Sequence, residues 1–193
     1  MARRVHRAAA AAPSSARAKS AWQENLESIL WAAALALVIR TLIVAPFKIP
    51  SGSMRPTLIE GDRILVNKFV YRFRQPRRGE IIVFRFPEDP KRPFIKRLIA
   101  VGGDTVEIRE GHIFVNGRMA SGEEVSPTTY YYNQGPFGQE QTVTDVPQDM
   151  YFVLGDNSSS SHDSRFWGFV PKRSLIGRAM SIFWPPTRLR VLR

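Results

Sequence analysis

The feature that most constrains the fold of this chain is an apolar run over residues 28–47. No charged side chain occurs between Ile29 and Ile39, and Arg40 is the one charged interruption of the run. A membrane-spanning helix needs roughly twenty mostly apolar residues, so the run is long enough to cross a bilayer. Arg40 is tolerated near an interface, where its stem can snorkel towards water. We therefore expect a transmembrane anchor helix over residues 26–46.

Two other interpretations of the apolar run stay open. A cleaved signal peptide also places a basic region before an apolar one, and a helix buried in a protein core is apolar as well. Cleavage after the run would leave Ser51 and Ser53 at a frayed N-terminus, which supports a catalytic group poorly. The anchor is preferred for this reason.

The distribution of charge gives the expected orientation. The 193 residues include 28 Lys and Arg against 17 Asp and Glu, and the first twenty positions contain five basic residues and no acidic one. Residues 1–25 are therefore expected to be a disordered, basic, cytoplasmic tail. Residues 47–193 then form an extracytoplasmic domain. The absence of cysteine excludes disulfides and cysteine-ligated metal sites. Because no nucleic-acid-binding motif is present, nucleic acid is not an expected partner.

The sequence after residue 58 predicts a mainly β fold. Alternation over Asp62–Val70, the run Glu80–Phe86 between a glycine and a proline, and Phe94–Val101 each predict a strand. Thr105–Val115 predicts a hairpin that turns at Glu110-Gly111, and a second turn is expected at Asn116-Gly117.

Further strands are predicted around Met150–Leu154 and Ser174–Trp184. Residues 118–148 are polar and rich in turn-forming residues, so they are interpreted as an insertion or small subdomain with little core of its own. Almost no helix is expected after residue 47.

The turn Pro50-Ser51-Gly52-Ser53 is the first candidate site. Glycine and proline can hold two hydroxyls on a stiff turn, where one serine can act as nucleophile and the other can face an oxyanion. An ordinary Ser/Gly/Pro loop has the same composition, so the assignment depends on partners elsewhere in the chain.

Histidine is the usual base for a serine, and the chain has His6, His112 and His162. His6 lies in the tail and His112 on a hairpin. The sequence Ser161-His162-Asp163 is reminiscent of a triad, but consecutive residues usually point in different directions. A Ser-His-Asp mechanism is therefore disfavoured.

Lysine can replace histidine if burial keeps its amine neutral. Period-two alternation places Lys96 on the same strand face as Phe94 and Leu98, which is unusual for a lysine. A lysine that snorkels at a strand edge is the other interpretation. The polar loop over residues 154–168, with its run of serines, could lie over such a site and orient an amine.

Four segments in this order resemble the conserved boxes of type I signal peptidases. They are Pro50–Leu58, Arg78–Phe84, Lys96-Arg97 with Gly103-Asp104, and Gly155-Asp156-Asn157 with the segment Ser161–Arg165. The resemblance covers most of residues 29–184. It implies a signal-peptidase-like β fold, similar also to LexA-like self-cleaving repressors, with one N-terminal transmembrane helix.

The resemblance also implies roles for individual residues. Ser53 would be the nucleophile and Lys96 the general base, with the Ser51 hydroxyl and the Ser53 N–H as the oxyanion hole. Ser161 would orient Lys96, and the site would be braced by Asp156, Arg97, Asp163 and Arg165. The shallow substrate pockets would be lined by Phe47, Ile49, Pro50 and Ile95. Neither metal nor cofactor is implied.

Two departures from the family pattern affect the supports of the site. Gly102 stands where the family usually has proline, so a looser turn is expected there. Residues 158–160 are serines in place of a segment that usually contains arginine, so a supporting ion pair is expected to be missing.

The function that follows is a membrane-bound serine endopeptidase that cleaves signal peptides from preproteins at small-x-small sites. Its expected partners are these signal peptides, the lipid bilayer and, by proximity, the export machinery. An exposed apolar surface near residues 42–54 and 183–186 would meet the membrane interface. The expected location is the plasma membrane, with a thylakoid membrane as the alternative. A self-cleaving repressor-type protease and a membrane-anchored β-rich binding protein are the other functions considered.

Overall fold

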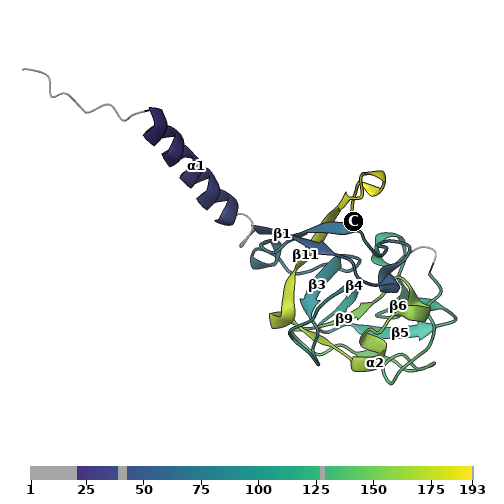
Figure 1. The fold of residues 1–193 in the computed structure, drawn as a ribbon. Helices are drawn as coiled ribbons and strands as arrows, with labels where there is room; N and C mark the ends of the chain where they lie inside the picture. Colours follow the sequence, from purple (N-terminus) through teal and green to yellow (C-terminus); the bar gives the residue numbers. More distant parts are fainter. Residues whose placement is uncertain (1–20, 39–42, 127–128, 193) are drawn as a thin grey trace, which may run out of the picture. The chain divides into compact units, whose positions relative to one another are not determined.

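The computed structural model describes residues 21–38, 43–126 and 129–192. The chain divides after Leu37 into two compact units, and the larger one consists mainly of β-strands (Figure 1). The mainly β fold expected from the sequence is thus confirmed.

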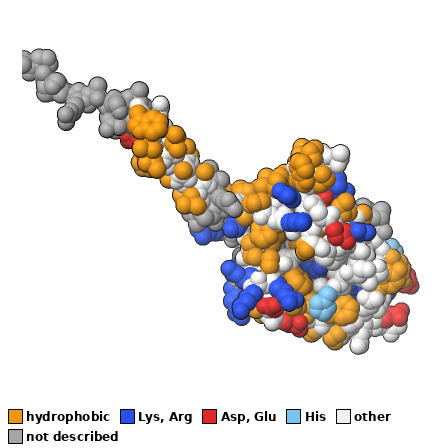
Figure 2. Space-filling view, viewed as in Figure 1, with side chains coloured by type: hydrophobic (Ala, Val, Ile, Leu, Met, Phe, Trp, Pro, Cys, Tyr) orange, Lys and Arg blue, Asp and Glu red, His pale blue; other side chains and the backbone are white. Residues whose placement is uncertain are grey.

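The first unit contains helix α1, Ala21–Val38. Its large apolar side chains are exposed: Leu30 is 62% and Trp31 71% accessible, and Figure 2 shows apolar side chains along the described helix. Among the described residues, no helix has the combination of length and apolarity that crossing a membrane requires.

The boundaries of the predicted tail and anchor differ from the structure. Residues 21–25, assigned to the tail, are helical, because Ala, Gln and Glu continue the helix on the N-terminal side of the apolar run. Residues 44–46, assigned to the anchor, lie in a strand, where Ala45 pairs with Val66 and is buried. Residues 1–20, with His6, and residues 39–42, with Arg40, lie outside the described part of the chain.

The larger sheet of the β unit has the strand order β1-β2-β11-β3-β4-β9-β10, with β12 beside β11, and its pairs are antiparallel. Its strands are β1 (Val44–Lys48), β2 (Arg63–Asn67), β3 (Ile81–Arg85), β4 (Pro93–Val101), β9 (Met150–Leu154), β10 (Val170–Pro171), β11 (Leu175–Trp184) and β12 (Arg190–Val191). All the strands predicted after residue 58 are therefore present, and several are shorter than predicted.

Strand β2 ends before the predicted residue 70 for a local reason. The Asn67 side chain accepts hydrogen bonds from the N–H groups of Phe69 and Val70, at 2.8 and 2.9 Å. These side-chain hydrogen bonds replace the hydrogen bonds that would continue the strand, so β2 ends at Asn67. The chain then forms a short 3-10 helix at Val70–Arg72.

The smaller sheet has the order β7-β6-β5-β8, with β5 (Thr105–Arg109), β6 (His112–Val115), β7 (Arg118–Met119) and β8 (Thr144–Asp145). Both predicted turns are confirmed. Glu110 and Gly111 have φ of 51° and 78°, and Asn116 and Gly117 have φ of 54° and 75°. Positive φ at both central residues is the geometry that matches the twist of a tight hairpin.

Strand β3 lies between two cores. Ile81 and Val83 belong to one apolar cluster, and Ile82 and Phe84 belong to another on the opposite face. A strand buried on both faces reads as a continuous apolar run, as this sequence does. The cluster that contains Ile81 also contains Met54 and Leu58 from the Ser53 turn.

The segment 118–148 contributes buried residues to a core that is formed mainly by other strands. Ala120, Tyr131 and Val146 are buried in the cluster formed by hairpin β5–β6 and β9. These few apolar residues are spaced irregularly among polar ones, so no periodicity marks them in the sequence.

The turn at Gly102 is closely packed, so the looser turn expected from the missing proline is not observed. A Cβ added at Gly102 would lie 2.9 Å from the carbonyl oxygen of Pro147 and 3.0 Å from the Asp149 nitrogen. Real Cβ atoms avoid such short distances. The absence of a side chain at Gly102 therefore lets its backbone pack against the backbone of residues 147–149.

Candidate active site

Ser53 lies in a one-turn 3-10 helix, Gly52–Met54, that follows β1. The next residues hold this turn in place, because the Met54 and Leu58 side chains are fully buried in the core and the Leu58 N–H donates to the Met54 carbonyl at 2.8 Å. The two apolar side chains and the hydrogen bond fix the backbone on which the Ser53 hydroxyl is carried.

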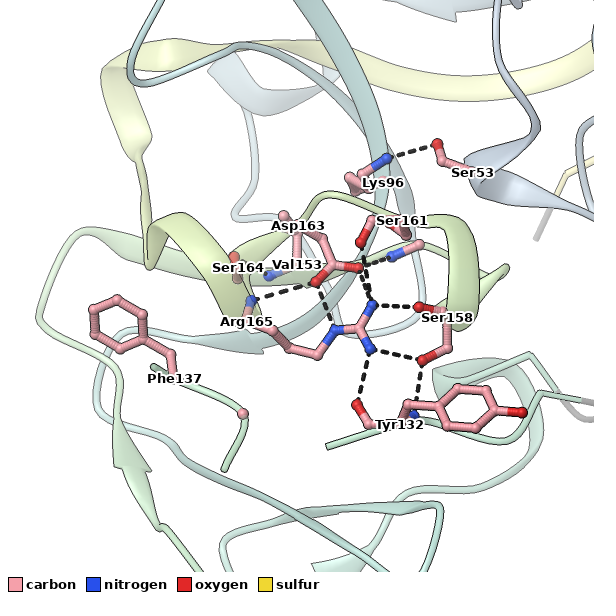
Figure 3. A network of polar contacts seen from close by, with 12 residues as sticks. Ser53, Lys96, Tyr132, Phe137, Val153, Ser158, Ser161, Asp163, Ser164 and Arg165 are labelled. Carbon is pink, nitrogen blue, oxygen red and sulfur yellow. Dashed lines mark hydrogen bonds and ion pairs between the residues drawn. The ribbon is translucent and has the colours of Figure 1, made fainter. Parts of the chain in front are cut away.

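Lys96 lies in β4, and its side chain is hydrogen-bonded to that of Ser53. Its Nζ donates to the Ser53 Oγ at 2.6 Å, and Lys96 and Ser53 are 3% and 8% exposed. Figure 3 shows the two side chains pointing towards each other. Nζ also lies 5.7 Å from the centre of the Phe94 ring, so Lys96 faces the same side as Phe94, as the alternation predicts. The structure thus brings together Ser53 and Lys96, which the family resemblance implies to be the nucleophile and the general base.

Burial controls the ionisation of Lys96. It lowers the pKa of the amine from its ordinary value of 10.5 to about 8, because a charged ammonium is costly in a site with little water. The carboxylates of Asp163 and Asp156 oppose this effect and raise the pKa, while the Arg165 charge lowers it. A neutral amine is therefore accessible near neutral pH.

Asp156 connects the strand of Lys96 to the Ser53 turn. Its carboxylate accepts two hydrogen bonds from Arg97, at 2.8 and 2.6 Å, and one from the Thr57 hydroxyl at 2.5 Å. Arg97 also donates to the Gly79 carbonyl at 2.8 Å. Bidentate pairing of this kind is geometrically specific, so it sets the position of β4 relative to the turn.

Asn157 and Gly155 bring the following loop against the Ser53 turn. Asn157 donates from its side chain to the Gly52 carbonyl and from its backbone to the Ser53 carbonyl, both at 3.0 Å. A Cβ on Gly155 would lie 2.5 Å from the Ser53 carbonyl oxygen and 2.1 Å from the Ser161 Oγ. Thr57 and Asn157 were not assigned roles from the sequence, because such contacts depend on the meeting of distant segments.

Arg165 is fully buried, and its five N–H donors all have acceptors (Figure 3). Asp163 accepts from it at 2.8 and 2.9 Å, so these two predicted supports form a pair. Ser158 accepts from it at 2.7 Å through its hydroxyl and at 2.8 Å through its carbonyl. The serine segment therefore supplies acceptors for Arg165, and this part of the site keeps a charged support despite the departure from the family pattern.

Ser161 is buried next to Gly155, and its hydroxyl has no hydrogen-bond partner among the described residues. The predicted bond to Lys96 is not formed in this arrangement. An unpartnered buried hydroxyl costs free energy, on the order of 1–3 kcal/mol, so it marks a place where a partner would bind favourably.

Neither of the two histidines that the structure describes takes part in the contact between Ser53 and Lys96. His112 is exposed on β6. The His162 ring packs against Phe166 with centres 5.3 Å apart, while the carboxylate of Asp163 accepts from Arg165 and from the Gly155 N–H. The residues Ser161-His162-Asp163 thus point in different directions, as expected.

A cleft of about 580 Å³ opens beside Ser53. Pro50, Ser51, Ile95 and Lys96 line it. Of the four predicted pocket residues, Pro50 and Ile95 are in its wall. Phe47 and Ile49 pack in the core cluster that also holds Met54, and Ile49 is only 2% exposed.

A serine hydroxyl within hydrogen-bond distance of a buried amine is an arrangement that also occurs in the class of hydrolases in which lysine replaces histidine beside the serine. Comparison with known proteins is more specific, because the model of the family "Signal peptidase, peptidase S26" matches residues 22–184. The chain therefore belongs to the signal peptidase family, peptidase S26, which confirms the resemblance seen in the sequence.

Three relatives illustrate the similarity. The chain is 41% identical over 181 residues to the probable signal peptidase I-2 of Synechocystis sp., covering 90% of this chain and 78% of the relative. It is 41% identical over 185 residues to the signal peptidase I of Leptolyngbya laminosa, covering 92% and 87%. It is 34% identical over 180 residues to thylakoidal processing peptidase 1 of Arabidopsis thaliana, covering 88% of this chain and 51% of that protein.

Proposed function

We propose that this protein is a membrane-bound serine endopeptidase that removes signal peptides from exported preproteins, with Ser53 as nucleophile and Lys96 as general base. The observation that carries the proposal is the 2.6 Å contact between two buried groups, one a hydroxyl and the other an amine of lowered pKa. Membership of the signal peptidase family supplies the substrate class.

The reaction follows from the positions of these groups. The neutral Lys96 amine takes the proton of Ser53, and Oγ attacks the carbonyl carbon of the scissile bond. The Ser51 hydroxyl and the Ser53 N–H donate to the resulting oxyanion. As the tetrahedral intermediate collapses, the C–N bond breaks and the Lys96 ammonium returns its proton to the leaving amine. Lys96 then deprotonates a water molecule, which hydrolyses the acyl-enzyme.

Small side chains before the scissile bond fit the wall of the cleft. Pro50 and Ile95 give it an apolar surface, and Ile95 packs against the core cluster that contains Ile49 and that the partly buried Phe47 also contacts. A shallow apolar recess favours small residues, because larger ones would have to displace packed core side chains.

The remaining predicted residues are proposed as positioning groups. Ser161, buried and without a described partner, would accept or donate a hydrogen bond to the Lys96 amine during the reaction. The pairs Arg97–Asp156 and Arg165–Asp163 hold the backbone on both sides of the dyad.

The membrane assignment is part of the proposal. The exposed apolar side chains of α1, such as Leu35 at 61%, would be satisfied by lipid, with the basic tail in the cytoplasm and the β unit on the outer face. Exposed Trp184, Leu189 and Val191 give the β unit an apolar surface of its own for the interface. The plasma membrane, near the export machinery, is the proposed location, and the thylakoidal relative makes a thylakoid membrane the alternative.

Incubation of the detergent-solubilised chain with a preprotein containing an Ala-x-Ala site tests the function, with the cut mapped by mass spectrometry. We expect one cut after the second alanine, and none with Ser53→Ala or Lys96→Ala. Lys91→Ala, which removes an exposed lysine near the start of β4, is the matched control and should cleave normally. If the intact chain leaves the preprotein uncut, or if Ser53→Ala cuts it, the proposal is wrong.

A further inference from the structure

A second hollow, of about 430 Å³, adjoins the cleft beside Ser53. Its walls include the side chains of Tyr130 and Tyr132, and we call it the tyrosine hollow. Arg55 and Asn157 line both the tyrosine hollow and the cleft. The two spaces are therefore neighbours along one surface of the β unit.

The tyrosines come from the segment 118–148, and polar contacts tie this part of it to the site. The Thr129 hydroxyl donates to the Asp156 carbonyl at 2.6 Å, and the Tyr132 N–H donates to the Ser158 hydroxyl at 2.9 Å. The Tyr132 carbonyl accepts from Arg165 at 2.9 Å (Figure 3). The backbone that carries the two rings is thus fixed by the loop that also braces Ser53.

The rings are held in a defined arrangement but remain accessible. Their centres lie 5.0 Å apart in an edge-to-face geometry, and Tyr130 is 57% and Tyr132 46% exposed. The Tyr130 ring lies so close over Gly111 that a Cβ there would be 2.1 Å from it. Rings fixed before binding lose little conformational entropy when they bind a ligand.

Geometry gives the direction in which a substrate would reach this hollow. A peptide crossing Ser53 has one part before the scissile bond and one part after it. The proposed pocket for the first part is formed by Pro50 and Ile95, which line the cleft but not the tyrosine hollow. The tyrosine hollow lies instead on the side of Arg55, two residues after Ser53. It is therefore available to the part of the peptide that follows the scissile bond.

We propose that the tyrosine hollow is a substrate subsite for the first residues of the mature chain, those that follow the scissile bond. This inference rests on the proposed function, and it assigns a role to the segment 118–148. The aromatic faces fit apolar or aromatic side chains at these positions. Arg55 at the shared rim is paired with Glu60 at 2.6 Å, so the rim has no unpaired charge from this residue to attract an acidic side chain.

The experiment compares synthetic peptides with the same Ala-x-Ala sequence before the scissile bond. One ends one residue after this bond, and three extend five residues beyond it, with apolar, glycine-rich or lysine-rich sequence. For the unchanged chain we expect the apolar extension to raise kcat/KM at least about threefold over the short peptide, mainly through a lower KM. The glycine-rich and lysine-rich extensions should each give a lower value than the apolar one, because neither places an apolar side chain on the rings.

The double variant Tyr130→Ala with Tyr132→Ala should lose this gain, so that the ratio of apolar-extended to short peptide falls to about one. Val143→Ala, which truncates another exposed apolar side chain of the same segment, is the matched control and should keep the ratio of the unchanged chain. If the double variant keeps the ratio, or the ratio is already one in the unchanged chain, the subsite is wrong. If no peptide is cleaved by the unchanged chain, the proposed function itself fails.

Discussion

The backbone N–H of Asn157 donates to the carbonyl of Ser53 at 3.0 Å, so the loop after β9 is hydrogen-bonded to the residue proposed as nucleophile. The Asn157 side-chain amide also donates to the carbonyl of Gly52 at 3.0 Å. The backbone that carries the Ser53 hydroxyl is thus held by a segment distant in the sequence, and mutations that displace this segment should lower activity.

Gly155→Ala tests this close approach. A methyl group there has no space between the Ser53 carbonyl and the Ser161 side chain. We expect kcat/KM to fall about a hundredfold, because an error of the order of 1 Å in a reacting group has an effect of this size. Steady-state cleavage of an Ala-x-Ala peptide measures it.

Gly117→Ala is the control for this substitution. Gly117 has a φ of 75° but open space around it, so alanine should lower the unfolding free energy by roughly 1–2 kcal/mol while kcat/KM stays the same. Equal kcat/KM values for Gly155→Ala and the unchanged chain would show that the loop does not position Ser53.

Asp156→Ala removes one partner of the buried pair with Arg97. The guanidinium would remain buried without its carboxylate, and we expect the unfolding free energy to fall by about 3–5 kcal/mol. Urea denaturation followed by tryptophan fluorescence measures the loss. The exposed pair Arg92–Asp89 is the comparison, and Asp89→Ala should cost less than about 1 kcal/mol. Similar losses for the two variants would contradict the bracing role of Asp156.

Ser158→Ala tests how the serine segment supports Arg165. It removes the hydroxyl that accepts from Arg165 and from the Tyr132 N–H, and it leaves the Ser158 carbonyl in place. The unfolding free energy should fall by roughly 1–3 kcal/mol. Ser159→Ala, at an exposed neighbour, should change it by less than about 0.5 kcal/mol. A Ser158→Ala protein as stable as the unchanged chain would argue against this support.

Lys96→Met should change how stability depends on pH. The folded pKa of about 8 is below the ordinary 10.5, so between these values the unfolded chain binds more protons and stability rises with pH. At pH 7 the buried amine therefore destabilises the fold, and replacement by methionine should stabilise it by about 2–4 kcal/mol. The gain should shrink as pH increases towards 10.5. Urea titrations of both proteins at pH 7 and pH 10 measure the stabilisation and its decrease with pH. A stabilisation by Lys96→Met that is the same at both pH values would contradict a lowered pKa of Lys96.

The sequence predicted the strands better than the contacts between them. Glu80–Phe86 was recognisable because a strand buried on both faces contains a nearly continuous apolar run, and the turns at Gly111 and Gly117 because few residues accept positive φ. The end of α1 was misplaced because apolar residues 44–46 suit a buried strand as well as a membrane helix.

The candidate site was predictable only in part. A lysine on an apolar strand face is a local signal, but its meeting with Ser53 needed the family resemblance. Besides Asp163, Arg165 donates to the Ser158 hydroxyl and to the carbonyls of Ser158, Ser161 and Tyr132, and no composition or spacing marks these acceptors. The residues of 118–148 that join the neighbouring core follow no period, so the sequence does not mark them.

The central claim is that a neutral Lys96 amine activates Ser53, and the pH dependence of cleavage tests it most directly. The value of kcat/KM for an Ala-x-Ala peptide should rise with pH on an acid limb centred near 8, because only the deprotonated amine can accept the serine proton. NMR titration of the Lys96 side chain should give the same pKa. An amine that titrates near 10.5 while cleavage proceeds fully at pH 7 would contradict the account.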